Sequence, residues 1–160
     1  MDFEPSRQVS CSKSLQQLKL AALFTNAKFT TTASLCMAAN SSDNGAPVFI
    51  TSCSDTTSQK VWTLPQIGHG NSGRYALAFG PGGTAPIKCL DVTDGQDGQA
   101  APGTKLQLWD CTTDHDISQG FLPTGVIAWQ ASGFNGLCVD LTDGIKNKGN
   151  QVGLSQIARS

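Results

Sequence analysis

A short cysteine-containing pattern recurs along the chain and limits the folds that the chain can adopt. "CLDVTDG" at Cys89–Gly95 returns as "CVDLTDG" at Cys138–Gly144, and a weaker copy, "CMAANSSDNG", covers Cys36–Gly45. Each copy is followed by a glycine and a short apolar segment, in "GAPVFITSC", "GTKLQLWDC" and "GNQVGLSQI". A unit of roughly 50 residues built from a few short strands cannot bury a hydrophobic face alone, so three such units must share one core.

The composition agrees with an all-β domain made of many short strands. The chain has 160 residues, enough for one domain, and is rich in the Gly, Ser, Thr, Asn and Asp residues that favour tight turns. A net charge of −1 gives no support to nucleic-acid binding. No apolar run reaches the roughly 18–20 residues that cross a membrane, so we expect no membrane insertion. His69 and His115 stand alone and no CxxC occurs, so the sequence indicates neither a metal nor a cofactor.

The six cysteines indicate an oxidising compartment. Their spacings suggest loops closed by disulfides, which persist in secreted and extracellular proteins. No clear signal peptide is recognised, because residues 1–10 are polar and "LKLAALF" is too short and too far into the chain. The cysteine pattern therefore favours a secreted or extracellular protein. The cysteines are Cys11, Cys36, Cys53, Cys89, Cys111 and Cys138.

The repeat pattern resembles the ricin B-type lectin family, whose fold is a β-trefoil. The matching marks are Cys-Leu-Asp-Val, Gly-Thr-Lys-Leu-Gln-Leu-Trp-Asp-Cys and the later Gln-x-aromatic "QGF". The resemblance spans roughly Phe29–Val152 and is nearest to secreted fungal members. It implies repeats at about 29–73, 74–125 and 126–160, with the third incomplete at its C-terminus. Residues 1–28 are expected to form a helix or a disordered segment.

Strand alternation predicts two different faces in the second repeat. Leu106 and Leu108 fall on one face, and Gln107 and Trp109 fall on the other. The leucines are expected to face the core. Gln107 and Trp109 would then share an outward surface.

The resemblance implies that Cys36 bonds Cys53 and that Cys89 bonds Cys111. Asp91 lies two residues after Cys89, and Trp109 lies two residues before Cys111. In paired strands a step of two residues returns to the same face, so a bond between these cysteines would carry the carboxylate and the indole to one patch.

This patch suits a sugar, because an indole stacks on the C–H face of a sugar ring and a carboxylate accepts hydrogen bonds from its hydroxyls. The resemblance assigns sugar contacts to Asp91, Trp109, Ser118 and Gln119, with serine standing where the family has asparagine. Gln107 adds a group that can both donate and accept. The implied function is a lectin-like module that binds galactose or N-acetylgalactosamine in glycans or glycoproteins, without catalysis. In relatives such a module can be fused to or associated with another domain.

The other two repeats depart from this pattern. In the first, Ala38 stands at the position of the aspartate, and Phe49 and Thr51 replace the glutamine and the aromatic residue. We therefore expect this repeat to support the fold without binding a sugar. In the third, Asp140 is a weaker candidate, because "GLSQIARS" supplies neither an indole nor a cysteine. Phe121 stands where the family has a structural tryptophan and is expected in the core.

Two other functions remain open at this stage. A trefoil can act as an inhibitor or protein-interaction module, for which the segment Pro65–Pro86, interpreted as a long loop, is the candidate surface. A glycan-processing enzyme would need a second carboxylate near Asp91, and only Asp94 and Asp97 lie in the same turn.

Cys11 and Cys138 are left without a partner by the repeat logic. A bond between them is a hypothesis, as is the idea that Ser14–Phe24 supplies the apolar surface that the third repeat lacks.

Overall fold

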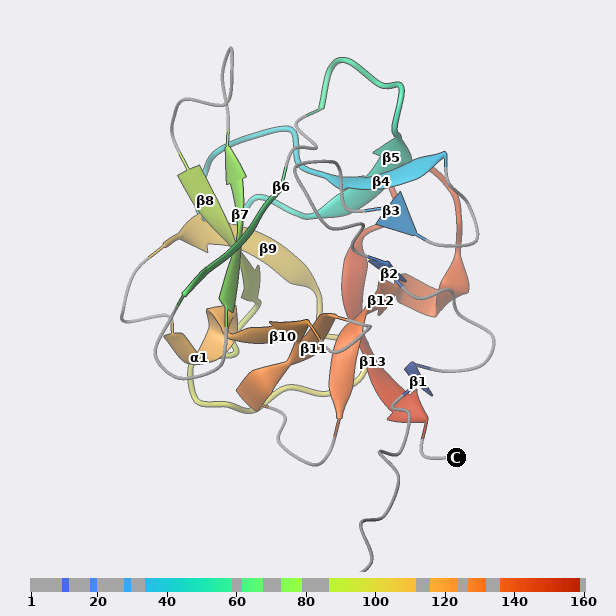
Figure 1. Cartoon of the computed structure of the whole chain (residues 1–160). Helices are drawn as coiled ribbons and strands as arrows, with labels where there is room; N and C mark the ends of the chain where they lie inside the picture. Colours follow the sequence, from blue (N-terminus) through green and yellow to red (C-terminus); the bar gives the residue numbers. More distant parts are fainter. Residues whose placement is uncertain are drawn as a thin grey trace, which may run out of the picture.

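The structure is a computed structural model, shown in Figure 1, and it is built almost entirely from short strands. It describes residues 10–11, 18–19, 28–29, 34–58, 62–67, 73–78, 87–111, 116–123, 127–131 and 136–158. The helical residues among them are a four-residue helix, α1 (Asp116–Gln119), and short 3-10 turns such as η4 (Thr142–Gly144).

The strands follow one another along the chain with few residues in each. They are β1 (Ser10–Cys11), β2 (Leu18–Lys19), β3 (Lys28–Phe29), β4 (Leu35–Ala38), β5 (Phe49–Ser52), β6 (Trp62–Ile67), β7 (Gly73–Ala78), β8 (Ile87–Val92), β9 (Leu106–Asp110), β10 (Phe121–Pro123), β11 (Ile127–Trp129), β12 (Leu137–Leu141) and β13 (Val152–Ala158). The prediction of an all-β fold is confirmed.

Strand pairing divides the fold into three equivalent antiparallel sets of four. The sets are β2-β3-β4-β5, β6-β7-β8-β9 and β10-β11-β12-β13, and each ends in a hairpin that carries one copy of the recurring pattern. Figure 1 shows the hairpins β4–β5, β8–β9 and β12–β13 in three different sectors of the molecule. The sheet also takes up β1, which pairs with the outer edge of β13.

A ring of backbone hydrogen bonds joins the three sets. In each repeat the glycine that opens the apolar segment donates its N–H to a strand of the next repeat. The bonds run from Gly45 to the Leu108 carbonyl (2.8 Å), from Gly103 to Leu154 (2.7 Å) and from Gly149 to Ile50 (2.8 Å). All three glycines have positive φ, between 85° and 93°. Residues with a Cβ adopt this conformation only at a cost, which explains why glycine opens every copy of the segment.

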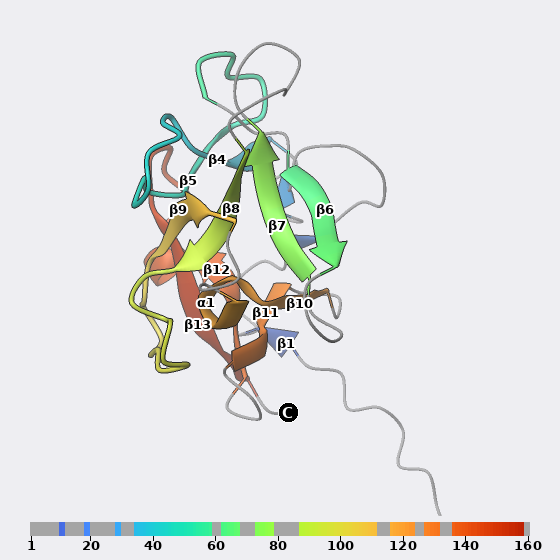
Figure 2. The ribbon, with the colours of Figure 1, turned by 90° about the vertical axis from the view of Figure 1, so that its left-hand side faces the viewer.

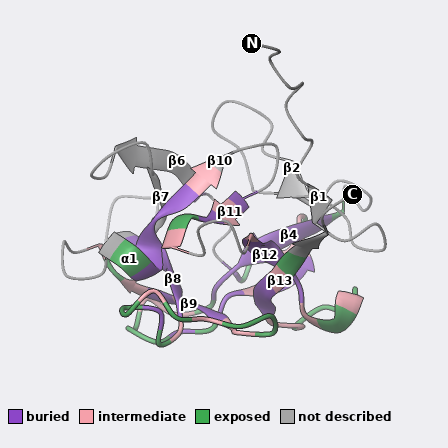
Figure 3. Ribbon diagram, turned by 90° about the horizontal axis from the view of Figure 1, so that it is seen from below, coloured by how far each residue is buried: buried purple, intermediate pink, exposed green. Residues whose placement is uncertain are grey.

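The core lies where the three hairpins face one another. Leu106 and Leu108 are fully buried, as the alternation of β9 predicted, and so are their counterparts in the other repeats. Phe121 is also fully buried, which confirms its expected place in the core. Figure 3 shows buried residues along the strands and mostly exposed residues in the connecting loops. The counterparts of the two leucines are Val48, Ile50, Val152 and Leu154.

Two regions differ from what the sequence suggested. The segment Pro65–Pro86 contains the end of β6 and all of β7, which pair with each other (Figure 2). It is therefore not one long loop; "GRYALA" was missed because its Gly and Ala residues have weak strand propensity. Within 1–28, the structure describes β1, β2 and the first residue of β3, while the rest of that segment lies outside the described residues.

Candidate functional site

The hairpin of β8 and β9 places the predicted site residues on one face of the second sheet. The ladder pairs Cys89 with Trp109 and Asp91 with Gln107, so all four side chains point to the same side. The Cys89–Cys111 disulfide is present, with Cα atoms 5.1 Å apart. The alternation and the cysteine pairing therefore bring the carboxylate and the indole to neighbouring positions on one face.

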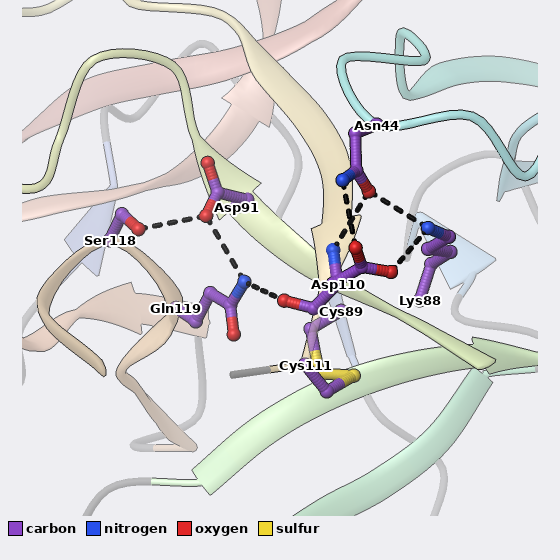
Figure 4. Close-up of a disulfide and its surroundings, with 8 residues drawn as sticks. All are labelled: Asn44, Lys88, Cys89, Asp91, Asp110, Cys111, Ser118 and Gln119. Atoms are coloured by element: carbon purple, nitrogen blue, oxygen red, sulfur yellow. Dashed lines mark hydrogen bonds and ion pairs between the residues drawn. A yellow bond between two sulfur atoms is a disulfide. The ribbon is translucent and has the colours of Figure 1, made fainter. Parts of the chain in front are cut away.

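Asp91 is the centre of a buried hydrogen-bond network. Its Oδ1 accepts from Gln107 Nε2 (3.0 Å), and its Oδ2 accepts from Ser118 Oγ (2.8 Å) and Gln119 Nε2 (3.2 Å). Asp91, Ser118 and Gln119 are all fully buried. Figure 4 shows Ser118 and Gln119 reaching the carboxylate from α1. Hydrogen bonds of this charge-assisted kind stabilise a buried carboxylate.

The amide of Gln119 has a fixed orientation. Its Nε2 donates both to Asp91 and to the backbone carbonyl of Asp110 (2.9 Å). A reversed amide would direct its oxygen at two acceptors, so the chemistry of the site selects this orientation. Its Oε1 points away from Asp91 in Figure 4 and is a buried acceptor without a hydrogen-bond partner. Such an atom lowers stability unless a donor reaches it.

Burial separates the site into covered and open parts. Gln107 and Trp109 are partly exposed, whereas the Asp91 carboxylate and its two donors from α1 are covered. The open part therefore offers an aromatic face and an amide, the pair of groups that can meet a sugar ring and its hydroxyls.

A second polar cluster lies beside this network and was not predicted from the sequence. Lys88 Nζ forms an ion pair with Asp110 Oδ1 (2.5 Å) and donates to Asn44 Oδ1 (2.8 Å). Asn44 in turn donates from Nδ2 to Asp110 Oδ2 (2.8 Å) and accepts from the Asp110 N–H (3.0 Å). The signal was available, because Lys88 and Asp110 immediately precede Cys89 and Cys111 and lie opposite each other once those cysteines pair. The contribution of Asn44, which comes from another repeat, was not deducible.

The first repeat lacks the site at every matching position. The ladder pairs Ala38 with Phe49 and Cys36 with Thr51, as the sequence alignment of the repeats placed them, and the Cys36–Cys53 disulfide is present. Thr51 stands at the position that Trp109 has in the second repeat, and its hydroxyl donates a hydrogen bond to Asp55 (3.0 Å).

Asp55 is held in a turn of hydroxyl and amide donors. A hydrogen bond from Ser58 is the main cause that lowers the pKa of the Asp55 carboxyl far below its ordinary value, with the Thr57 N–H and hydroxyl adding to it. This carboxylate is therefore satisfied within its own turn.

The third repeat keeps a carboxylate without its partners. Asp140 lies opposite Gly153, and Cys138 lies opposite Ser155, so neither a glutamine nor an indole occupies the matching positions. Asp140 is only 2% exposed, and its Oδ2 has no hydrogen-bond partner. Burial raises the pKa of the Asp140 carboxyl, opposed by hydrogen bonds from the Leu141 N–H and the Ser155 side chain.

Among the described residues, no three His, Cys, Asp or Glu side chains gather where they could hold a metal ion. His69 and His115 lie outside those residues. Cys138 is disulfide-bonded, and the side chain of Cys11 lies outside the described part of the chain.

The acidic turn after β8 does not add a second carboxylate to the Asp91 network. Asp94 is exposed and has a positive φ of 55°. Asp97 is also exposed, and its Oδ1 accepts from the Gln99 N–H (2.8 Å) within the same turn. The described contact of the Asp97 carboxyl therefore lies within the turn itself.

Comparison with known proteins agrees with this architecture. None of the curated proteins compared matches the chain. No helix in the described part of the structure is long and apolar enough to span a membrane. The model of the ricin-type β-trefoil lectin domain matches residues 32–160, which include all three hairpins and the whole Asp91 network. Because this match covers most of the chain, the protein belongs to the ricin-type β-trefoil lectin domain family, whose members are generally carbohydrate-binding modules.

Proposed function

We propose that the second repeat binds a galactose-type sugar, either galactose or N-acetylgalactosamine in a glycan. The observation that carries the proposal is the convergence of Gln107, Ser118 and Gln119 on the Asp91 carboxylate, with Trp109 on the same face of the sheet. These residues come from three separate elements, β8, β9 and α1. The other two repeats do not assemble the same set.

The open part of the site supplies the first contacts. The partly exposed indole of Trp109 stacks on the C–H face of the sugar, and Gln107 lies beside it on the same strand. Because Gln107 gives its Nε2 to Asp91, its Oε1 is left to accept a hydrogen bond from a sugar hydroxyl.

Asp91 acts as the charged acceptor beneath these groups. It is fully covered, so a sugar hydroxyl reaches it by taking the place of one of its donors. Ser118 is the donor that gives way most easily, because its hydroxyl turns about a single bond. The exchange replaces one charge-assisted hydrogen bond by another and leaves the carboxylate satisfied.

A single site of this size binds a monosaccharide weakly. We expect a dissociation constant on the order of 0.1–1 mM, because few contacts offset the entropy lost on association. Tighter attachment to a glycan surface then requires several copies or a linked domain.

The test is a glycan array, followed by titration calorimetry with galactose, on the wild type and on Trp109→Ala. The wild type is expected to bind galactose-terminated glycans, and Trp109→Ala to lose that binding, while Trp109→Phe keeps part of it. Thr51→Ala, at the matching position of the first repeat, is the control and should bind as the wild type does. Binding that survives in Trp109→Ala, or a wild type that binds no galactose-type glycan, contradicts the proposal.

Two disulfides and a lectin domain are compatible with an extracellular location. We propose that the protein is secreted and functions outside the cell, where these bonds persist. The check is to express the full-length protein in its source cells and assay culture medium and lysate for it by antibody. Protein found only in the lysate, with reduced cysteines, contradicts secretion.

A further inference from the structure

The cluster of Asn44, Lys88 and Asp110 joins the first repeat to the second at the edge of the Asp91 network. Lys88 and Asp110 face each other across β8 and β9, and Asn44 reaches them from the loop before β5. Figure 4 shows the three side chains linked to one another next to the Cys89–Cys111 disulfide. Lys88 is 8% exposed, and its ammonium group contacts both of these partners.

Asp110 is the residue through which this cluster meets the site. Its N–H, part of the peptide that joins it to Trp109, donates to Asn44 Oδ1 (3.0 Å). Its carbonyl accepts from Gln119 Nε2 (2.9 Å), and the same Nε2 donates to Asp91. The backbone on both sides of Asp110 is therefore held by side chains.

The other two repeat junctions provide an internal comparison. All three junctions share the glycine-to-strand hydrogen bonds. At the other two, however, the residues that match Asn44 are Pro102 and Lys148. The ion pair is absent from both, because the positions of Lys88 and Asp110 are taken by Leu137 with Gln156 and by Leu35 with Ser52. Within the described part of the chain, this cluster accompanies only the repeat with the indole and the complete network.

The loop that carries Asn44 also borders Gln107. Pro47 forms an isolated bridge with Gln107, and a Cβ on Gly45 would lie 3.9 Å from Gln107 Oε1. The first repeat, which has no site of its own, thus contacts the site strand β9 of the second at several points.

We propose that Asn44 is a positioning residue for the sugar site of the second repeat, an inference that rests on the proposed function. By holding Asp110 together with Lys88, it fixes the peptide next to Trp109 and the carbonyl that orients Gln119. The first repeat then serves the second as a support that keeps the indole and the amide in register with Asp91.

The experiment compares the full-length wild type, Asn44→Ala and Lys148→Ala by three measurements. These are galactose binding by calorimetry, acrylamide quenching of tryptophan fluorescence and unfolding in urea. Trp62 and Trp129 are only 3% and 2% exposed, so quenching reports mainly on Trp109. Lys148→Ala is the matched control, because Lys148 is exposed and stands at the same place in another junction.

Asn44→Ala is expected to raise the galactose dissociation constant roughly tenfold and to increase quenching, while Lys148→Ala changes neither. Loss of stability alone, with wild-type quenching and wild-type affinity per folded molecule, overturns the proposal. A wild type that binds no galactose defeats the proposed function instead. In that event increased quenching in Asn44→Ala still supports the positioning of Trp109, and unchanged quenching rejects it.

A second variant covers the case in which Asn44→Ala does not fold. Asn44→Asp keeps the oxygen that accepts from Asp110 and Lys88, and it replaces the donor to Asp110 Oδ2 by a second carboxylate oxygen that repels it. Its folded form is expected to show weaker binding and increased quenching in the same direction. Wild-type values for both would overturn the proposal.

Discussion

Three carboxyl groups, one in each repeat, differ in the hydrogen bonds that stabilise them. Asp91 is buried with donors from Gln107, Ser118 and Gln119, whereas Asp55 is held by hydroxyls in an open turn. Asp140 is buried with an oxygen that has no partner. The energetic effect of each carboxyl group therefore depends on its burial and on the donors around it.

The donors of Asp91 make it sensitive to the loss of a single hydroxyl. We expect Ser118→Ala to lower the free energy of unfolding by about 1–2 kcal/mol, because a buried carboxylate loses one charge-assisted hydrogen bond. Urea unfolding at neutral pH measures the change. Thr57→Ala, which removes a hydroxyl from the more open Asp55, is the control and should cost less. Equal losses in the two variants would show that burial does not strengthen the Ser118 contact.

At neutral pH the ionised carboxyl of Asp140 lowers the stability of the folded protein. Its raised pKa means that the folded state disfavours the ionised carboxyl. As pH falls through the raised pKa, the folded protein takes up the proton before the unfolded chain does, so stability rises until pH passes the unfolded value of about 3.9. Asp140→Asn should therefore be more stable than the wild type at pH 7, and this advantage should shrink towards pH 4.

The measurement for Asp140 is urea unfolding across this pH range. Asp143→Asn is the control, because Asp143 is exposed in the adjacent turn and asparagine tolerates its positive φ of 53°. If Asp140→Asn is not more stable at pH 7, the ionised carboxyl is better solvated than its burial indicates.

At the scale of elements, the hairpins β4–β5 and β8–β9 are each closed by a disulfide, so the effects of the two bonds on stability and binding can be compared. Cys36–Cys53 and Cys89–Cys111 are separated by 17 and 22 residues, so the chain-entropy model gives each about 3 kcal/mol. Only the second lies beside the indole and the Asp91 network.

Replacing both cysteines of either pair by alanine should therefore have similar effects on stability and different effects on binding. Each double variant is expected to lose about 2–4 kcal/mol of unfolding free energy. Galactose binding by the folded protein should weaken only in Cys89→Ala/Cys111→Ala. Calorimetry and urea unfolding of the two variants check this, and equal weakening of binding in both would show that the disulfides act through the whole fold.

The sequence predicted these hairpins because the cysteine pattern and the glycine that follows it recur along the chain. Leu106 and Leu108 could be assigned to the core from period alone, and Asp91 could be placed near Trp109 once a cysteine pair was assumed. The contact of Asn44 with Lys88 and Asp110 could not be predicted, because it joins residues of different repeats and depends on how the hairpins pack. β7 was missed for a local reason, since "GRYALA" carries little strand propensity and its partner β6 lies across an irregular register.

At the scale of the whole molecule, the three four-stranded sets obtain their first strand from different parts of the chain. β6 follows the first hairpin and leads into the second set, and β10 does the same for the third. The first set begins instead with β2, from the start of the chain, while β1 covers the edge of β13 (Figure 1). β2 therefore takes the same place in the first set as β6 and β10 take in the other two, while β1 extends the sheet beyond β13.

These pairings make β1 and β2 part of the folded domain. Deleting residues 1–20 removes β1 and β2 and leaves backbone groups of β3 and β13 unpaired. Since each backbone hydrogen bond contributes about 1 kcal/mol, we expect a loss of about 2–4 kcal/mol in urea unfolding, together with self-association through the exposed edges. Deleting residues 1–9 stops before β1 and should leave stability unchanged. If the longer deletion is as stable and as monomeric as the shorter one, by urea unfolding and light scattering, the threefold sheet holds without these strands, and residues 1–20 are dispensable for folding.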